Sequence, residues 1–80
     1  MHPDIQTTRK KIGHRIKVRR VELGLNQSEL GDIMNLAQAQ ISEWEIGRRA
    51  LRIEQAMELA RALKTTVGYL VGESETRDAA

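Results

Sequence analysis

The chain has 80 residues, a formal net charge of +2 and a sequence pI near 9.4, so we expect one small domain with a single core. It contains no Phe and no Cys, and only one Trp and one Tyr, which leaves Ile, Leu, Val, Met and Ala to fill that core. These residues suit packed helices better than strands, and we therefore expect an all-α protein. The lack of Cys excludes disulfides, thiolate metal sites and cysteine nucleophiles.

The sequence also gives little support for a metal site, a cofactor or a membrane-spanning segment. His2 and His14 are the only imidazoles, and no carboxylates surround them at ligand spacing, so we expect no metal site and no cofactor. No apolar run approaches the ~18 residues of a membrane span, and the N-terminus lacks the apolar stretch of a secretory signal. We expect a cytoplasmic protein that does not contact membranes.

Residues 1–8 hold the only Pro and show no apolar period, so we expect a flexible N-terminal arm there. A first helix should run from about Thr8 to Leu23, and Gly24 should end it in the left-handed conformation. The basic residues of this helix follow one another without an intervening acid: Arg9, Lys10, Lys11, Arg15, Lys17, Arg19 and Arg20. We expect them to attract phosphate, the alternative being an ordinary solvated helix face.

Signals for a second helix follow directly. Asn26 is a favourable N-cap, and Glu29 three residues later completes a capping-box pattern. Gly31 would allow close approach of the next helix, and Asn35 tolerates the left-handed conformation that a tight turn requires. The pattern predicts a short helix and then a tight turn into another.

That next helix, from about Gln38 to Glu45, divides into two faces at ~100° per residue. Ala37, Ile41 and Trp44 share the apolar face, and we expect Trp44 to pack in the core rather than to stack on bases. The opposite face is built from small or polar side chains: Gln38, Ala39, Ser42 and Glu43. These offer the donors, acceptors and methyl groups that base edges in a DNA major groove require. The composition of this face therefore predicts that it contacts the bases of DNA.

Two further helices are expected after the loop that contains Gly47. The fourth carries one apolar stripe at helical spacing: Ile53, Ala56, Met57, Ala60 and Leu63. Thr65 and Thr66 offer caps for a short fifth helix that ends at Val71. The folded domain should thus span residues 9–72, and residues 73–80 should form a disordered tail.

The order Leu25-x-Gln27-x-x-Leu30, followed by Ile41-Ser42-x-Trp44-Glu45-x-Gly47, resembles the Xre/Cro family of phage and bacterial helix-turn-helix regulators. The resemblance covers about residues 12 to 72. It extends to Ile12-Gly13-x-x-Ile16 and Arg20, and to Arg48-Arg49, Glu54, Leu59-Ala60-x-Ala62-Leu63 and Leu70-x-Gly72. The chain departs from the family pattern at Arg19, at Ala37 and at Leu51-Arg52. The resemblance implies a compact five-helix bundle, the lambda repressor-like DNA-binding domain.

Roles for particular residues also come from the resemblance. Arg20 and Glu45 would form a structural ion pair. Contacts to the DNA backbone would come from residues that flank the second and third helices: Asn26, Gln27, Arg48 and Arg49. The face that would read bases is the one described above.

The function implied is sequence-specific binding of double-stranded DNA. We expect a transcriptional repressor that acts as a homodimer on a pseudo-palindromic operator, with recognition helices ~34 Å apart. Dimerisation is assigned to apolar residues of the fifth helix, which could instead cap the monomer core: Val67, Tyr69, Leu70 and Val71.

A second hypothesis is an antitoxin-like or bridging module that binds a protein partner, with DNA binding secondary. The acid Glu43 on the reading face and the modest net charge keep this alternative open. We do not expect an enzyme, because no nucleophile, base and orienting group occur together and no glycine loop could cradle a phosphate.

Overall fold

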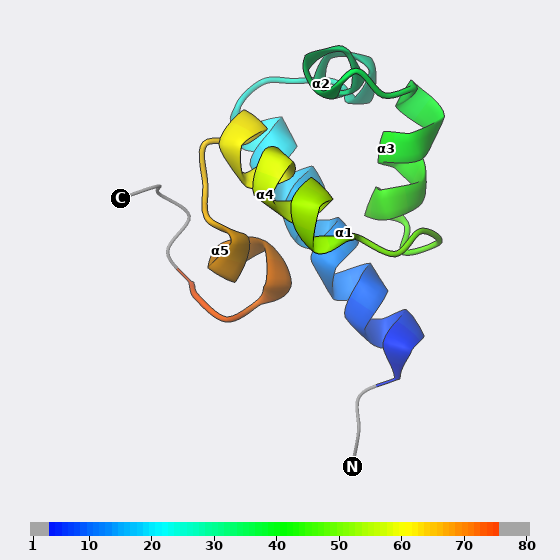
Figure 1. The fold of residues 1–80 in the computed structure, drawn as a ribbon, viewed down its shortest axis with the longest axis vertical. Helices are drawn as coiled ribbons and strands as arrows, with labels where there is room; N and C mark the ends of the chain where they lie inside the picture. The colour runs from blue at the N-terminus through cyan, green and yellow to red at the C-terminus, as the bar shows by residue number, and fades with distance from the viewer. Residues whose placement is uncertain (1–3, 76–80) are drawn as a thin grey trace.

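The computed structural model describes residues 4–75, which fold into five α-helices with no strand among them (Figure 1). The helices are α1 (Ile5–Glu22), α2 (Gln27–Met34), α3 (Gln38–Glu45), α4 (Ile53–Ala62) and α5 (Val67–Val71). The prediction of an all-α, five-helix bundle is confirmed. None of these helices combines the length and apolar character needed to cross a bilayer.

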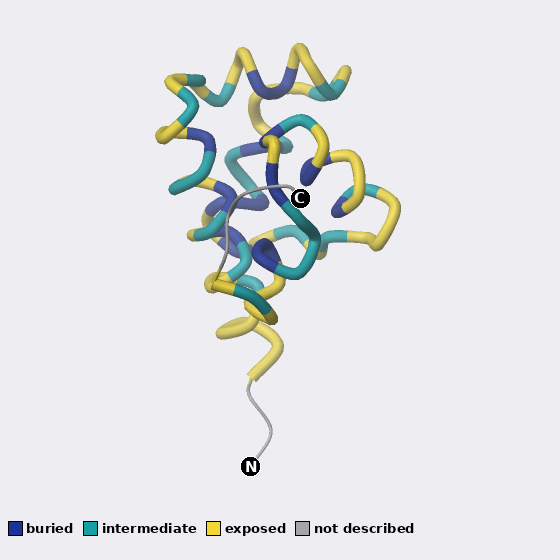
Figure 2. Tube along the Cα trace, turned by 90° about the vertical axis from the view of Figure 1, so that its left-hand side faces the viewer, coloured by how far each residue is buried: buried dark blue, intermediate teal, exposed yellow. Residues whose placement is uncertain are grey.

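The first helix begins earlier than the sequence predicted. The Asp4 carboxylate caps α1 by accepting from the amide of Gln6 at 3.0 Å, so the helix starts at Ile5 instead of Thr8. The predicted arm over residues 1–8 is therefore wrong for residues 5–8, and residues 1–3 lie outside the described part of the chain. The first turns of α1 project beyond the bundle and are mostly exposed (Figure 2).

The core forms along α1, which contacts α3 on one side and α5 on the other (Figure 1). All five helices, or the residues that end them, contribute side chains that are almost inaccessible to solvent: Ile16, Leu30, Ile41, Trp44, Leu59, Leu63 and Leu70. Trp44 packs in this core, as predicted, and its indole N–H donates to the Ala50 carbonyl at 3.3 Å. Full burial of a large apolar side chain contributes about 1.5–3 kcal/mol, so this cluster is the main source of stability.

The turns between helices are tight because single residues adopt the left-handed conformation. Gly24 after α1 (φ 73°) and Asn35 after α2 (φ 57°) do so as predicted. Lys64 after α4 (φ 52°) does so without any signal in the sequence. Each turn closes with an amide that donates back across it, as from Thr65 to the Ala60 carbonyl at 2.8 Å.

The apolar stripe of α4 is only partly buried. Ala56, Ala60 and Leu63 enter the core as predicted, joined by Leu59. Ile53 and Met57 belong to the predicted stripe but are 63% and 52% exposed, so the stripe extends beyond the core. These two side chains instead form an apolar flank on the surface of α4.

The residues after α5 are held against α1, at least as far as the description extends. Arg15 donates to the carbonyls of Tyr69 at 3.0 Å and Ser74 at 3.3 Å, and its guanidinium lies 4.8 Å from the centre of the Tyr69 ring. The predicted disordered tail of residues 73–80 is therefore wrong for residues 73–75, and residues 76–80 lie outside the described part.

Close contact between α1 and α3 depends on the absence of a side chain at Gly13. A Cβ built there would lie 2.5 Å from the Glu45 carbonyl oxygen and nearer still to that of Trp44. These are backbone atoms at the end of α3, and they cannot move without shifting the whole helix. Gly13 therefore sets the distance between the two helices.

Gly13→Ala should destabilise the fold by about 1–3 kcal/mol, because overpacking outweighs the gain in helix propensity. Urea denaturation would measure the change. The matched control is Gly68→Ala in α5, where a Cβ would meet nothing closer than 3.7 Å. That variant should be neutral or up to ~1 kcal/mol more stable. Equal effects of the two substitutions would contradict the close approach of α1 and α3.

Candidate nucleic-acid interface

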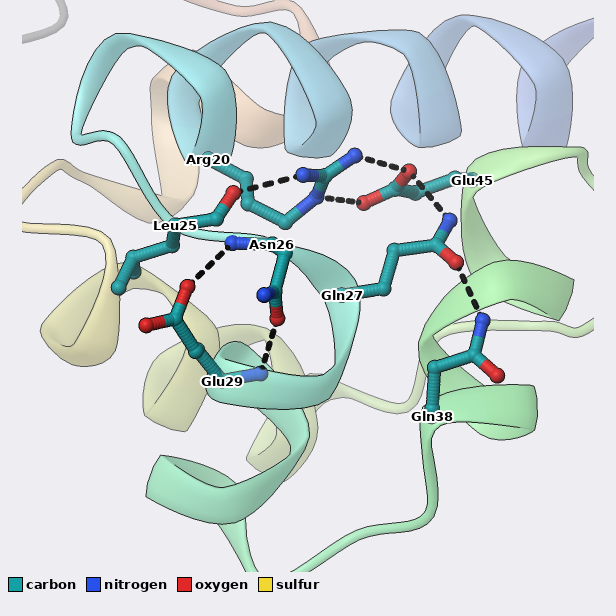
Figure 3. Close-up of polar contacts among 7 residues, drawn as sticks. All are labelled: Arg20, Leu25, Asn26, Gln27, Glu29, Gln38 and Glu45. Atoms are coloured by element: carbon teal, nitrogen blue, oxygen red, sulfur yellow. Dashed lines mark hydrogen bonds and ion pairs between the residues drawn. The ribbon is translucent and has the colours of Figure 1, made fainter.

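A buried ion pair joins α1 to the end of α3. Arg20 Nε and Nη2 donate to the two carboxylate oxygens of Glu45 at 2.7 Å and 3.0 Å, and both residues are 8% exposed (Figure 3). The pair predicted from the family resemblance is thus confirmed. Hydrogen bonding to Glu45 raises the pKa of Arg20, and desolvation offsets part of that rise. The pair with Glu45 therefore favours the charged form of Arg20.

The pair also holds the connection between α1 and α2. Arg20 Nη1 donates to the Leu25 carbonyl at 2.7 Å, so the guanidinium fixes the chain just before the second helix (Figure 3). α2 then begins with the predicted capping box: the Asn26 side chain accepts from the Glu29 amide at 2.7 Å, and the Glu29 carboxylate accepts from the Asn26 amide at 2.9 Å. These contacts fix the start of α2 relative to α3.

Gln27 extends the network from the buried pair to the exposed face of α3. Its Nε2 donates to Glu45 Oε1 at 2.9 Å, and its Oε1 accepts from the side-chain amide of Gln38 (Figure 3). The sequence assigned Gln27 to the DNA backbone, whereas the structure uses it as a bridge between Glu45 and Gln38. Gln38 is consequently oriented before any ligand arrives.

The turn between α2 and α3 is compact, and it leaves α3 without a side-chain cap. A Cβ at Gly31 would lie 2.6 Å from the Leu36 carbonyl oxygen, so the close approach predicted at Gly31 is confirmed. Ala37 precedes α3 and has no side-chain acceptor for the first amides of that helix. The Ala37 amide itself donates to Gln40 Oε1 at 3.0 Å. The N-terminus of α3 is therefore exposed and electropositive.

The four residues predicted to read bases lie on one side of α3. Gln38 and Ala39 are exposed, whereas Ser42 and Glu43 are partly covered. The opposite side carries Ile41 and Trp44 into the core. The two-faced character predicted for this helix is confirmed by Ile41 and Trp44, whereas the assignment of Ala37 to the core face is wrong, because Ala37 precedes the helix and is exposed.

Glu43 has a partner that the sequence did not reveal. Arg49 Nε and Nη2 both donate to Glu43 Oε1, at 3.1 Å and 2.8 Å, and each side chain remains about half exposed. The sequence assigned Glu43 to bases and Arg49 to the DNA backbone, but the structure joins them. Arg48, also assigned to the backbone, is exposed on the same loop.

The basic run of α1 is split by the fold. Arg15, Arg19 and Arg20 turn inward, with Arg19 donating to the Leu63 and Lys64 carbonyls at 2.8 Å and 3.0 Å. The contacts of Arg19 place its guanidinium at the carboxyl end of α4, where the helix dipole favours a positive charge. The prediction that these residues attract phosphate is wrong for those three, since their donors are engaged inside the protein.

The first turns of α1 lie beside the loop after α3, and they carry the basic residue Lys10. Gln6 Nε2 donates to the Gly47 carbonyl at 2.9 Å, and a Cβ at Gly47 would lie 2.8 Å from Lys10 Cγ. The first turns of α1 thus flank the loop that carries Arg48. Lys10 adds a positive charge beside that loop.

The helix-turn-helix family model matches residues 16–70, which include the whole of α2, α3 and α4. The chain belongs to the helix-turn-helix family. The Xre/Cro resemblance noted in the sequence is thereby confirmed, and the arrangement of the five helices is that of the lambda repressor-like domain.

Two solved structures of regulators share this fold over most of their length. The P22 c2 repressor, solved in complex with a synthetic operator, is 30% identical with a TM-score of 0.73, over 79% of this chain and 96% of the repressor chain. The restriction-modification controller protein C.AhdI from Aeromonas hydrophila is 27% identical with a TM-score of 0.73, over 78% of this chain and 94% of its own. A search of curated protein sequences gave no significant match.

The same fold also occurs as part of an enzyme. Hydroxypropylphosphonic acid epoxidase from S. wedmorenis is 23% identical with a TM-score of 0.77, over 81% of this chain but only 35% of the enzyme. At that identity the likeness concerns the fold alone. The helix-turn-helix unit corresponds to about a third of that enzyme chain.

Proposed function

We propose that this protein is a sequence-specific, double-stranded DNA-binding transcription regulator that represses by occupying promoter DNA as a homodimer. One observation supports this most strongly: the exposed face of α3 presents Gln38, and the buried Arg20–Glu45 pair orients it through Gln27. A surface side chain seldom has such support. Preorganisation of this kind lowers the entropy lost when a side chain binds a base edge.

The hydrogen bonds of Gln38 suit adenine. One hydrogen of its Nε2 is used by Gln27, which leaves the second N–H and the carbonyl oxygen for a ligand. Adenine offers the N7 acceptor and the N6 donor in the major groove, so the remaining pair is complementary to it. Ala39 is exposed next to Gln38, and its methyl group fits against a thymine methyl.

Groups around α3 would position the protein on the DNA backbone without reading sequence. Arg48 is exposed on the loop after α3, and the Asn26 side-chain N–H groups remain after its oxygen has capped α2. The uncapped first amides of α3 favour a phosphate oxygen. Gln27 retains one amide hydrogen that could reach the same phosphate.

The alternative is a protein-binding module for which DNA is secondary. The ion pair between Glu43 and Arg49 weakens it, because the acid on the reading face is neutralised and no longer repels DNA. A gel shift with genomic fragments at several salt concentrations separates the two: salt-sensitive binding supports a DNA-binding regulator, and its absence supports the module.

Gln38→Ala and Arg48→Ala should affect DNA binding in different ways. Loss of the Gln38 base contact should cost about 1–3 kcal/mol on a selected operator and little on a scrambled duplex. Loss of the Arg48 charge should weaken both duplexes about equally and reduce the salt slope by roughly one. Affinity for both duplexes across a salt series measures this. The same specific-to-non-specific ratio in both variants would contradict the division of roles.

Dimerisation belongs to the proposal, but the structure changes the surface that it would use. Tyr69 and Leu70 are 5% and 0% exposed, so their side chains pack in the monomer core, as the alternative interpretation held. Val67 is partly buried and Val71 is 36% exposed. Val67, but not Val71, borders a groove that continues onto the apolar flank of α4. This groove is lined by Met57, Ala60, Arg61, Lys64, Thr65, Thr66 and Val67. We assign the second copy of the chain to this groove and flank.

Met57→Glu should impair dimerisation without unfolding the monomer, because Met57 is 52% exposed. Burial of a Met side chain contributes about 1.5–3 kcal/mol, so affinity for a two-half-site operator should fall about tenfold or more. The control is Val21→Glu, which places the same charge on an exposed residue of α1. Sedimentation velocity and gel shifts on one and two half-sites provide the measurement. A wild-type protein that stays monomeric and binds single half-sites would refute the dimer.

A further inference from the structure

We infer that Arg49 reads a guanine in the major groove and that Glu43 holds it in position for this contact, an inference that rests on the proposed DNA-binding function. Sequence alone suggested the opposite assignment, with Glu43 at the bases and Arg49 at the phosphates. The geometry of the loop after α3 reverses those roles.

The backbone brings Arg49 back to α3. After α3 the Gly47 amide donates to the Trp44 carbonyl at 3.1 Å and the Arg48 amide to the Glu43 carbonyl at 2.8 Å, and Gly47 is left-handed at φ 81°. This pair of hydrogen bonds is a Schellman motif, which reverses the chain sharply at the end of a helix. Arg49, on the loop, consequently lies beside Glu43, which belongs to α3 and to its reading face.

The contact uses one edge of the guanidinium and leaves another. Arg49 Nε and Nη2 both donate to Glu43 Oε1, at 3.1 Å and 2.8 Å. The outer edge, with one hydrogen of Nη2 and those of Nη1, makes no hydrogen bond or ion pair within residues 4–75 and lies on the side away from Glu43. Guanine presents O6 and N7 as two adjacent acceptors in the major groove, and a two-donor edge of Arg is the group that most often binds them.

Electrostatics favour the same assignment. An unpaired carboxylate on a DNA-facing surface is repelled by the phosphates, whereas a Glu43–Arg49 pair carries no net charge. Pairing also makes Arg49 a weaker general phosphate ligand than Arg48, for which no ion pair occurs in the described chain. Glu43 thus serves as a positioning residue, and Arg49 determines specificity through its planar edge.

The first step selects binding sites from random DNA with the wild-type chain. The second step measures affinity for the selected duplex and for a series of duplexes in which each guanine in turn is replaced by 7-deazaguanine. The variants are Arg49→Lys, Arg49→Ala and Glu43→Gln, with Arg48→Lys as the matched control. Circular dichroism checks the folding of each variant. We expect all of them to fold, because both residues of the pair are about half exposed.

With the wild type, 7-deaza substitution at one guanine should lower affinity about 2- to 12-fold, because it removes the N7 acceptor and keeps O6, so one of the two hydrogen bonds to Arg49 is lost. Arg49→Lys and Glu43→Gln should each abolish the preference at that same base pair, whereas Arg48→Lys should keep it. The Glu43→Gln change should add little in an Arg49→Lys background, because both act through one contact.

Other outcomes overturn the inference. If Arg49→Lys keeps the guanine preference and Arg49→Ala weakens all duplexes alike, Arg49 binds phosphate. If Glu43→Gln alone changes the preferred base, Glu43 reads the base itself. In both cases the wild type still selects a sequence, so the regulator proposal survives. If the wild type selects no sequence, the proposed function and this inference fail together.

Discussion

The fold and its candidate interface both depend on the buried ion pair between Arg20 and Glu45. Removing either partner would leave an uncompensated charge among apolar side chains, which costs about 3–5 kcal/mol. Each side-chain nitrogen and oxygen of the pair has a hydrogen-bond partner, with Leu25 and Gln27 adding to the bonds between Arg20 and Glu45. An apolar pair could hold α1 against α3 equally well. What an apolar pair could not supply is the acceptor that orients Gln27, and through it Gln38.

Features encoded by neighbouring residues were predicted correctly from the sequence. The capping box of Asn26 and Glu29, the left-handed turn at Asn35 and the two faces of α3 each depend on local backbone geometry or helical period. The Arg20–Glu45 pair spans 25 positions, and it was predicted only because the family resemblance supplied the pairing. The helix-turn-helix match over residues 16–70 confirms that family and, with it, the architecture.

Features that depend on tertiary contact could not be predicted in this way. The sequence predicts that Arg15 and Arg19 attract phosphate from the surface, because nothing local shows that the ends of α4 and α5 bring carbonyls within their reach. Ile53 and Met57 fit an apolar stripe by period, yet the crossing of α4 over the core leaves that flank exposed. The start of α1 is a different case, because the Pro and the missing apolar period of residues 1–8 predict an arm, whereas in the structure the Asp4 side chain caps a helix that begins at Ile5.

The central claim is that the buried pair orients the reading face as well as stabilising the fold. Its most direct test is the specific-to-non-specific affinity ratio of the double variant Arg20→Met/Glu45→Leu, with the free energy of unfolding measured alongside. We expect the double variant to regain most of the stability lost by either single variant, because no buried charge is left unpaired. Its preference for the selected operator should nevertheless fall to nearly that of Gln38→Ala, since Gln27 has lost its acceptor. A stable double variant that keeps the full wild-type preference would contradict the account.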